Sequence, residues 1–72
     1  MDLPSIESVA ERVHERWLAT KRAEGVTSRL SERGEELMVE YGRLSDGAKE
    51  LDRETVRAVY AAIEAAMTSE DE

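Results

Sequence analysis

Apolar side chains recur at helical spacing along residues 5–24. Positions 6, 9, 10, 13, 17 and 18 are apolar, which is the i, i+3, i+4, i+7 pattern of an amphipathic helix. Pro4 suits a first turn, Ser5 or Ser8 can cap it, and Gly25 is placed to end the helix. The pattern therefore predicts a first helix over residues 5–24.

A second apolar stripe lies near the carboxyl end of the chain. Its members are Val56, Val59, Tyr60, Ile63 and Met67. The alanines between them favour helix and allow a partner helix to approach closely. We expect a last helix from Arg53 to Met67, capped by Asp52, and a disordered acidic tail over residues 69–72.

The residues between these stripes predict a loop and short helical pieces. Residues 26–36 show no sustained period and predict a loop, whereas residues 37–44 keep helical spacing and predict a short second helix. Ser45 opens a turn signal and can cap a helical turn ending near Leu51. The predicted fold class is all-α: a single domain over residues 1–68, with two long amphipathic helices, one or two short helices and a loop between them.

The length and composition predict a thin core without covalent reinforcement. The chain has 72 residues and no cysteine, so disulfides and thiolate metal sites are excluded. It shows no apolar run of roughly 20 residues and no basic stretch followed by an apolar one. We therefore expect a cytoplasmic protein that does not enter a membrane.

Charge is unevenly distributed along the chain. The net charge is −7; residues 1–34 carry six acidic and six basic side chains, and residues 35–72 carry eleven and four. This acidity argues against nucleic-acid binding, although an acidic decoy for a nucleic-acid site is a third, weaker hypothesis. A local cationic face is one interpretation of the basic residues, and a solvated surface of mixed charge is the other. The residues of that face would be Arg12, Arg16, Lys21, Arg22, Arg29 and Arg33.

The residue types predict that the protein is not an enzyme and needs no cofactor. No serine lies in a Gly-x-Ser-x-Gly elbow. The chain has one histidine but no cysteine that could act as a nucleophile beside it. His14-Glu15 begins like a zinc motif, but position 18 is leucine rather than a second histidine, so no metal site is expected.

One edge of the first predicted helix carries candidate binding residues. At 100° per residue, His14 lies about 60° from Trp17 and about 20° from Lys21. Their rings and charge, with Arg22 beside them, could bind a small anionic ligand. The alternative is structural: Trp17 anchors the core, and His14 bonds to a neighbouring carbonyl.

Three blocks of sequence resemble a ryanodine receptor repeat (RyR) domain over residues 6–65. The blocks are Val13-His14-Glu15-Arg16-Trp17 with Lys21-Arg22 and Gly25; Leu37-Met38-Val39-Glu40-Tyr41 with Leu44; and Lys49-Glu50-Leu51-Asp52-Arg53-Glu54 with Val56. The chain lacks the Trp-x-Tyr-Gly that usually follows the family's glycine. Glu40 replaces the family's proline, which predicts a more helical segment from Leu37 to Tyr41.

The resemblance implies a non-enzymatic binding module, because these repeats are peripheral modules of a calcium channel and a role in sensing nucleotide-like ligands has been suggested for microbial relatives. We expect a small anionic ligand or a protein partner at the His14, Trp17, Lys21 edge, with Tyr41 and Arg53 closing the site. The alternative is a structural protein that acts through homodimerisation, or through docking of its last helix on a larger assembly.

Overall fold

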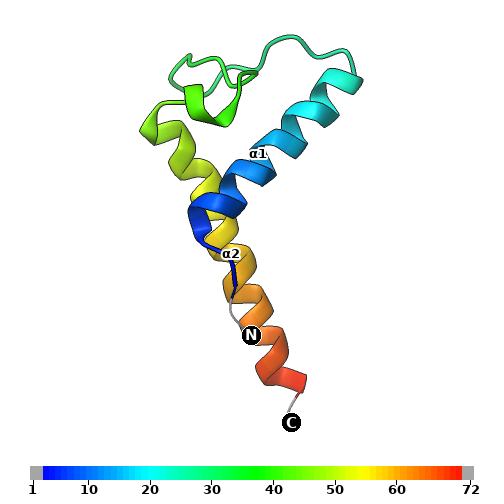
Figure 1. The fold of residues 1–72 in the computed structure, drawn as a ribbon, viewed down its shortest axis with the longest axis vertical. Helices are drawn as coiled ribbons and strands as arrows, with labels where there is room; N and C mark the ends of the chain where they lie inside the picture. The colour runs from blue at the N-terminus through cyan, green and yellow to red at the C-terminus, as the bar shows by residue number, and fades with distance from the viewer. Residues whose placement is uncertain (1–2, 71–72) are drawn as a thin grey trace.

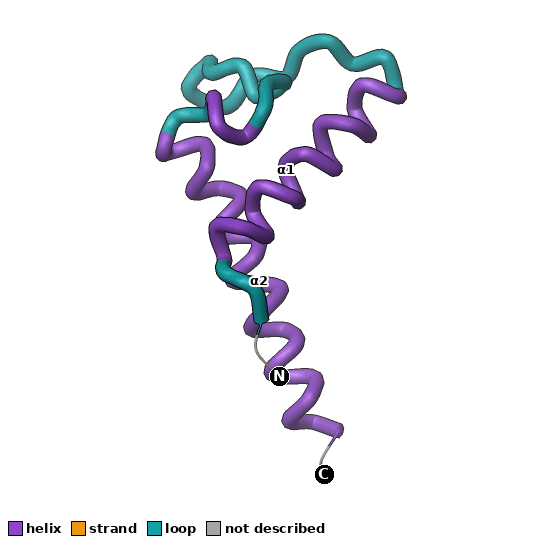
Figure 2. Tube along the Cα trace, in the orientation of Figure 1, coloured by secondary structure: helices purple, strands orange, loops and turns teal. Residues whose placement is uncertain are grey.

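Two helices running in opposite directions form a V, and a loop spans its open end (Figure 1). The computed structural model describes residues 3–70, with α1 at Ile6–Ala23, a 3-10 turn η1 at Tyr41–Arg43 and α2 at Asp46–Glu70. Those residues contain no β-strand, only one antiparallel bridge between Leu30 and Glu36 (Figure 2). The all-α prediction is confirmed.

Helix α1 begins and ends where its local signals predict. The Ser5 side chain accepts a hydrogen bond from the Ser8 backbone N–H at 3.1 Å, so Ser5 is the cap. Gly25 follows the helix with φ of 83°, and the Val26 N–H donates to the Lys21 carbonyl at 2.9 Å. This pair of features is the Schellman ending that glycine permits.

Helix α2 is one long helix, so the prediction of two helical pieces separated at Asp52 was wrong. It begins after Ser45, whose hydroxyl accepts from the Ala48 N–H at 3.1 Å. No glycine or proline follows Gly47, so nothing in the sequence interrupts the helix. The backbone also stays helical past Met67 to Glu70; residues 71–72 of the expected tail lie outside the described residues.

The predicted helix over residues 37–44 was also wrong, including the expectation attached to Glu40. Only η1 is helical there, and Glu40 is extended at φ −60° and ψ 147°. The Glu36 carboxylate accepts from the Met38 N–H at 3.1 Å, and the Leu37 N–H donates to the Arg29 carbonyl at 2.7 Å. The bond to Arg29 and the bridge between Leu30 and Glu36 join this segment to the loop that precedes it, rather than to a helical turn of its own.

The core lies inside the V, between α1, η1 and α2. It is small, as the chain length predicts. The buried residues are Ala10, His14, Leu18, Tyr41, Leu44, Ala48 and Val56. No helix among the described residues has the length and apolar character needed to cross a membrane.

Candidate functional site

His14 is a buried connector between α1, the loop and α2. It is 3% exposed, and its Nε2 lies 2.7 Å from the Val39 carbonyl oxygen. Because a carbonyl only accepts, Nε2 carries the proton of that bond. Its Nδ1 lies 3.5 Å from the Asp52 carboxylate, and burial raises the Asp52 pKa while His14 acts in the opposite direction. Both ring nitrogens thus face groups of the protein itself.

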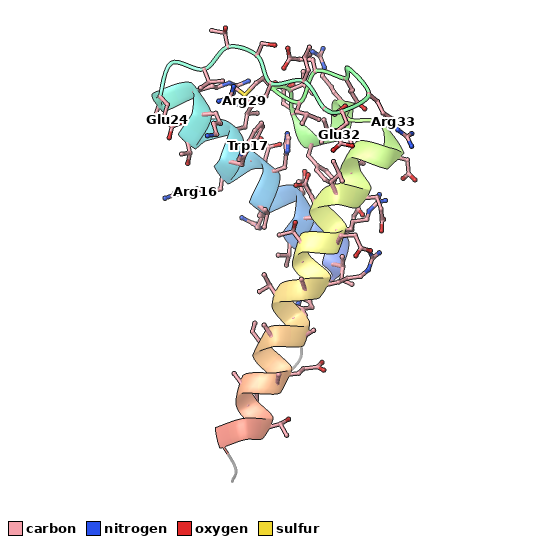
Figure 3. All side chains as sticks on the ribbon, turned by 180° about the vertical axis from the view of Figure 1, so that it is seen from behind. Arg16, Trp17, Glu24, Arg29, Glu32 and Arg33 are labelled. Carbon is pink, nitrogen blue, oxygen red and sulfur yellow. The ribbon has the colours of Figure 1, made fainter. Side chains whose placement is uncertain are left out.

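Trp17 lies beside His14 on the inner side of the V. The two ring centroids are 5.5 Å apart, and Trp17 is half-buried. In Figure 3, Trp17 faces the loop, whereas Arg16 points away from the molecule. Both rings border a cavity of about 280 Å³. Its other lining residues are Val13, Leu37, Leu44, Ala48, Leu51, Asp52 and Thr55. This lining is mostly apolar, and its one charged residue is acidic.

Tyr41 is part of the core. It is 4% exposed, and its hydroxyl donates to the Glu7 carboxylate at 2.8 Å. Its backbone N–H donates to the Glu15 carboxylate at 3.0 Å, which fixes η1 on α1. Burial first, and the bond to Glu7 second, raise the Tyr41 pKa. The roles of Glu7 and Glu15 were not predicted, since acidic residues on a helix are usually solvated.

Arg53 pairs with carboxylates of both helices. Its Nε lies 2.7 Å from Glu7, and its Nη1 lies 3.2 Å from Asp46 and 3.3 Å from Glu50. These bonds, the one from Glu7 most strongly, raise the pKa of the guanidinium above its ordinary value. Arg53 was predicted to close a ligand site, but its guanidinium N–H groups instead join α1 to α2.

The predicted cationic residues are not gathered at the cavity beside Trp17. Lys21 Nζ lies 3.3 Å from the Glu24 carboxylate, and Arg22 is exposed in the last turn of α1. Neither lines the cavity. Arg16 and Arg33 lie at opposite sides of the molecule (Figure 3). Of the predicted site residues, the structure thus brings together His14 and Trp17, with Tyr41 next to His14 at 6.1 Å between ring centroids.

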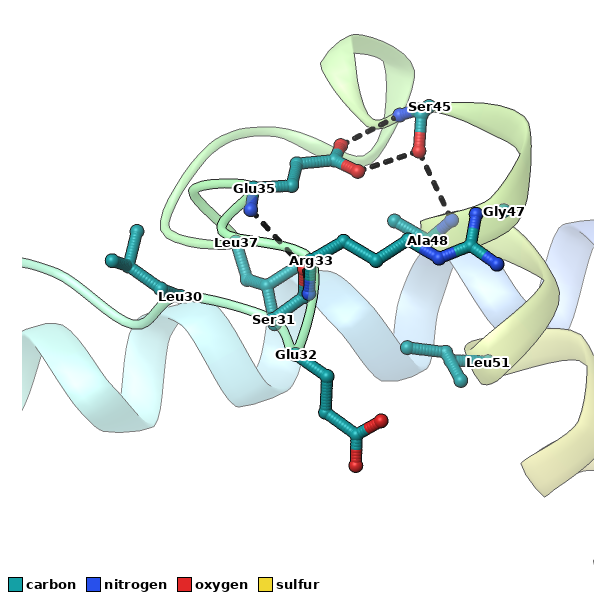
Figure 4. A pocket seen from close by; sticks show the side chains of 10 residues that line it. All are labelled: Leu30, Ser31, Glu32, Arg33, Glu35, Leu37, Ser45, Gly47, Ala48 and Leu51. Atoms are coloured by element: carbon teal, nitrogen blue, oxygen red, sulfur yellow. Dashed lines mark hydrogen bonds between the residues drawn. The ribbon is translucent and has the colours of Figure 1, made fainter.

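A second cavity, of about 580 Å³, lies between the loop and the first turn of α2 (Figure 4). A carboxylate of the loop bonds to the start of α2 at one side of this cavity. The Glu35 carboxylate accepts from the Ser45 N–H at 2.9 Å and from its hydroxyl at 2.6 Å. These bonds lower the Glu35 pKa, the side-chain bond most strongly.

Three exposed apolar side chains form a ridge on the second half of α2, the helix that the alternative hypothesis uses for docking. Val59 is 50%, Ile63 39% and Met67 55% exposed, and the three are spaced four residues apart. Residues i, i+4 and i+8 form one ridge on a helix surface. Beyond Tyr60, whose hydroxyl donates to the Pro4 carbonyl at 2.8 Å, no other helix of the described chain lies beside α2 (Figures 1 and 3). We call Val59, Ile63 and Met67 the α2 ridge.

The sequence matches no protein-family model, and no curated protein or solved structure matches it. Among the side chains that the structure describes, those of residues 3–68, no group of three or more histidines, aspartates or glutamates is arranged to hold a metal ion.

Proposed function

We propose that this protein is a helical association module that acts through protein contact at the α2 ridge, rather than through chemistry. The observation that supports the proposal is the exposure of Val59, Ile63 and Met67 on α2, which continues past α1, the other α-helix of the described residues. Each of these side chains would gain free energy by leaving water, at about 25 cal/mol per Å² of apolar surface buried. A helix in a groove, or beside another helix, is a common occupant of such a face.

The contacts of the predicted ligand residues favour this function over anion binding. His14, Tyr41 and Arg53 already bond to Val39, Glu7 and neighbouring carboxylates within the chain. An anionic ligand would have to displace these bonds before gaining its own. The resemblance to RyR domains remains a prediction, and a non-enzymatic peripheral module agrees with both the resemblance and the ridge.

Photo-crosslinking in the cells that produce the protein tests this function. A benzophenone amino acid at Val59 on the ridge should form protein adducts, and the same amino acid at Ala61 should form none. Ala61 is exposed on another face of the same helix, so it controls for mere accessibility. The crosslinked peptide of the partner should come from the apolar face of a helix.

A second substitution tests whether the adduct at Val59 depends on the apolar ridge. Ala62→Glu places a carboxylate beside Val59 and Ile63 and should abolish the adduct at Val59. Equal labelling from Val59 and Ala61, or adducts that survive Ala62→Glu, would contradict the proposed function.

A further inference from the structure

The α2 ridge lies next to a row of small side chains on the same helix. Ala62 and Ala66 are four residues apart and exposed, and by helix geometry they follow the ridge on one side. A ridge of large residues beside a groove of alanines is a surface that fits a copy of itself. We call Ala62 and Ala66 the alanine groove.

From this juxtaposition we infer that two copies of the chain pair through α2, antiparallel, with the ridge of each in the alanine groove of the other. The inference rests on the proposed function and names its partner. In the register centred between Ala62 and Ile63, Val59 of one copy meets Ala66 of the second, and Ile63 meets Ala62. The two-fold axis then makes every contact reciprocal, as a closed dimer requires.

Charge selects this segment as the place where two acidic copies can meet. The chain has a net charge of −7, whereas residues 55–68 contain one arginine and one glutamate and therefore have no net charge. Those two, Arg57 and Glu64, lie roughly 150° or more around the helix from the centre of the groove. Like charges therefore repel least at the ridge and the groove.

The helix dipole favours the antiparallel direction, because the dipoles of antiparallel helices attract each other and those of parallel helices repel.

The geometry predicts a close but limited contact. Packing of i±4 ridges gives helix axes that cross at roughly 50° and lie about 8–10 Å apart, and alanines favour the short end of that range. Such a crossing covers only the turns around Ala62, less than the roughly 800 Å² per partner of a stable complex. We therefore expect reversible pairing, detected at roughly 0.1–1 mM protein.

Sedimentation equilibrium of the purified full chain tests the pairing. The wild type should show a monomer–dimer equilibrium. Ala62→Glu should raise the dissociation constant at least roughly tenfold, because the axis brings two carboxylates together. Ala61→Glu carries the same charge on the opposite side and should stay within about twofold. Circular dichroism verifies that both variants remain helical.

Disulfide trapping tests the direction. An equimolar mixture of Val59→Cys and Ala66→Cys proteins should form the mixed disulfide in preference to either homodimer, since those positions face each other only in antiparallel helices. Predominant Val59→Cys homodimer would overturn the antiparallel register. A strictly monomeric wild type at roughly 1 mM would overturn the pairing itself, and crosslinking to a different protein at Val59 would then leave the proposed function standing.

Discussion

Replacing His14 by leucine should loosen the loop more than the helices. Leucine keeps an apolar side chain in the core but removes the donor to the Val39 carbonyl, 2.7 Å away, and the imidazole facing Asp52. Leaving a buried acceptor unpaired costs about 1–3 kcal/mol, and we expect a loss of about 2 kcal/mol in the free energy of unfolding. A chain of this length has a total stability of roughly 4–10 kcal/mol, so the loss should be readily measured.

Urea unfolding followed by circular dichroism gives the global effect, and hydrogen exchange gives its location. The amides of residues 37–41 should exchange faster, while those in the middle of α1 keep most of their protection. Ala19→Leu introduces the same residue at an exposed position of α1 and serves as the control. A loss below about 0.5 kcal/mol, the range of ordinary surface changes, would refute the connecting role of His14.

Two further predictions concern the end of α1 and the response to acid. Gly25→Ala should destabilise the protein by about 1 kcal/mol, because φ there is 83°; Gly42→Ala, where φ is not positive and space is open, should change urea unfolding by less than half as much. As the pH is lowered below about 4.5, the urea concentration at the midpoint of unfolding should decrease. The reason is that hydrogen bonds in the folded chain lower the pKa of several carboxyls from the ordinary value of 4.5. The stability that these carboxyls contribute is complete above their pKa in the unfolded chain, and it is lost as the pH falls through their lowered pKa values in the folded chain. Asp52 has the opposite sign, since its pKa is raised, and Asp52→Asn should steepen the decline; a midpoint that rises on acidification would contradict the assignment. The carboxyls with lowered pKa are Glu7, Glu35, Glu36 and Glu50.

The parts of the fold that could be predicted are those with local causes. Ser5 and Gly25 set the ends of α1 through bonds to residues within five positions, and the apolar stripe reports its buried face. The segment 37–40 could not be predicted, because its apolar residues have helical spacing but its hydrogen-bond partners lie in other parts of the chain. Val39, for example, is held by a side chain 25 positions away.

The same distinction holds for the candidate site. Helix geometry correctly put His14 and Trp17 side by side, since both belong to α1. It could not show that Asp52 faces His14, because that requires the relative placement of two helices. Asp52 instead looked like a cap, which is the usual local interpretation of an aspartate before a helical stripe.

The bonds within the loop also bear on how the chain folds. Glu7 and Arg53 are 46 positions apart, so their pairing closes a long segment of chain. Serine and glutamate side chains of the loop bond to partners at most ten positions away and organise residues 28–45 locally. Loop-closure entropy depends on how many residues remain flexible. A loop already shortened by local bonds lets α1 and α2 find each other at a smaller entropic cost, which favours rapid folding of a chain with so small a core.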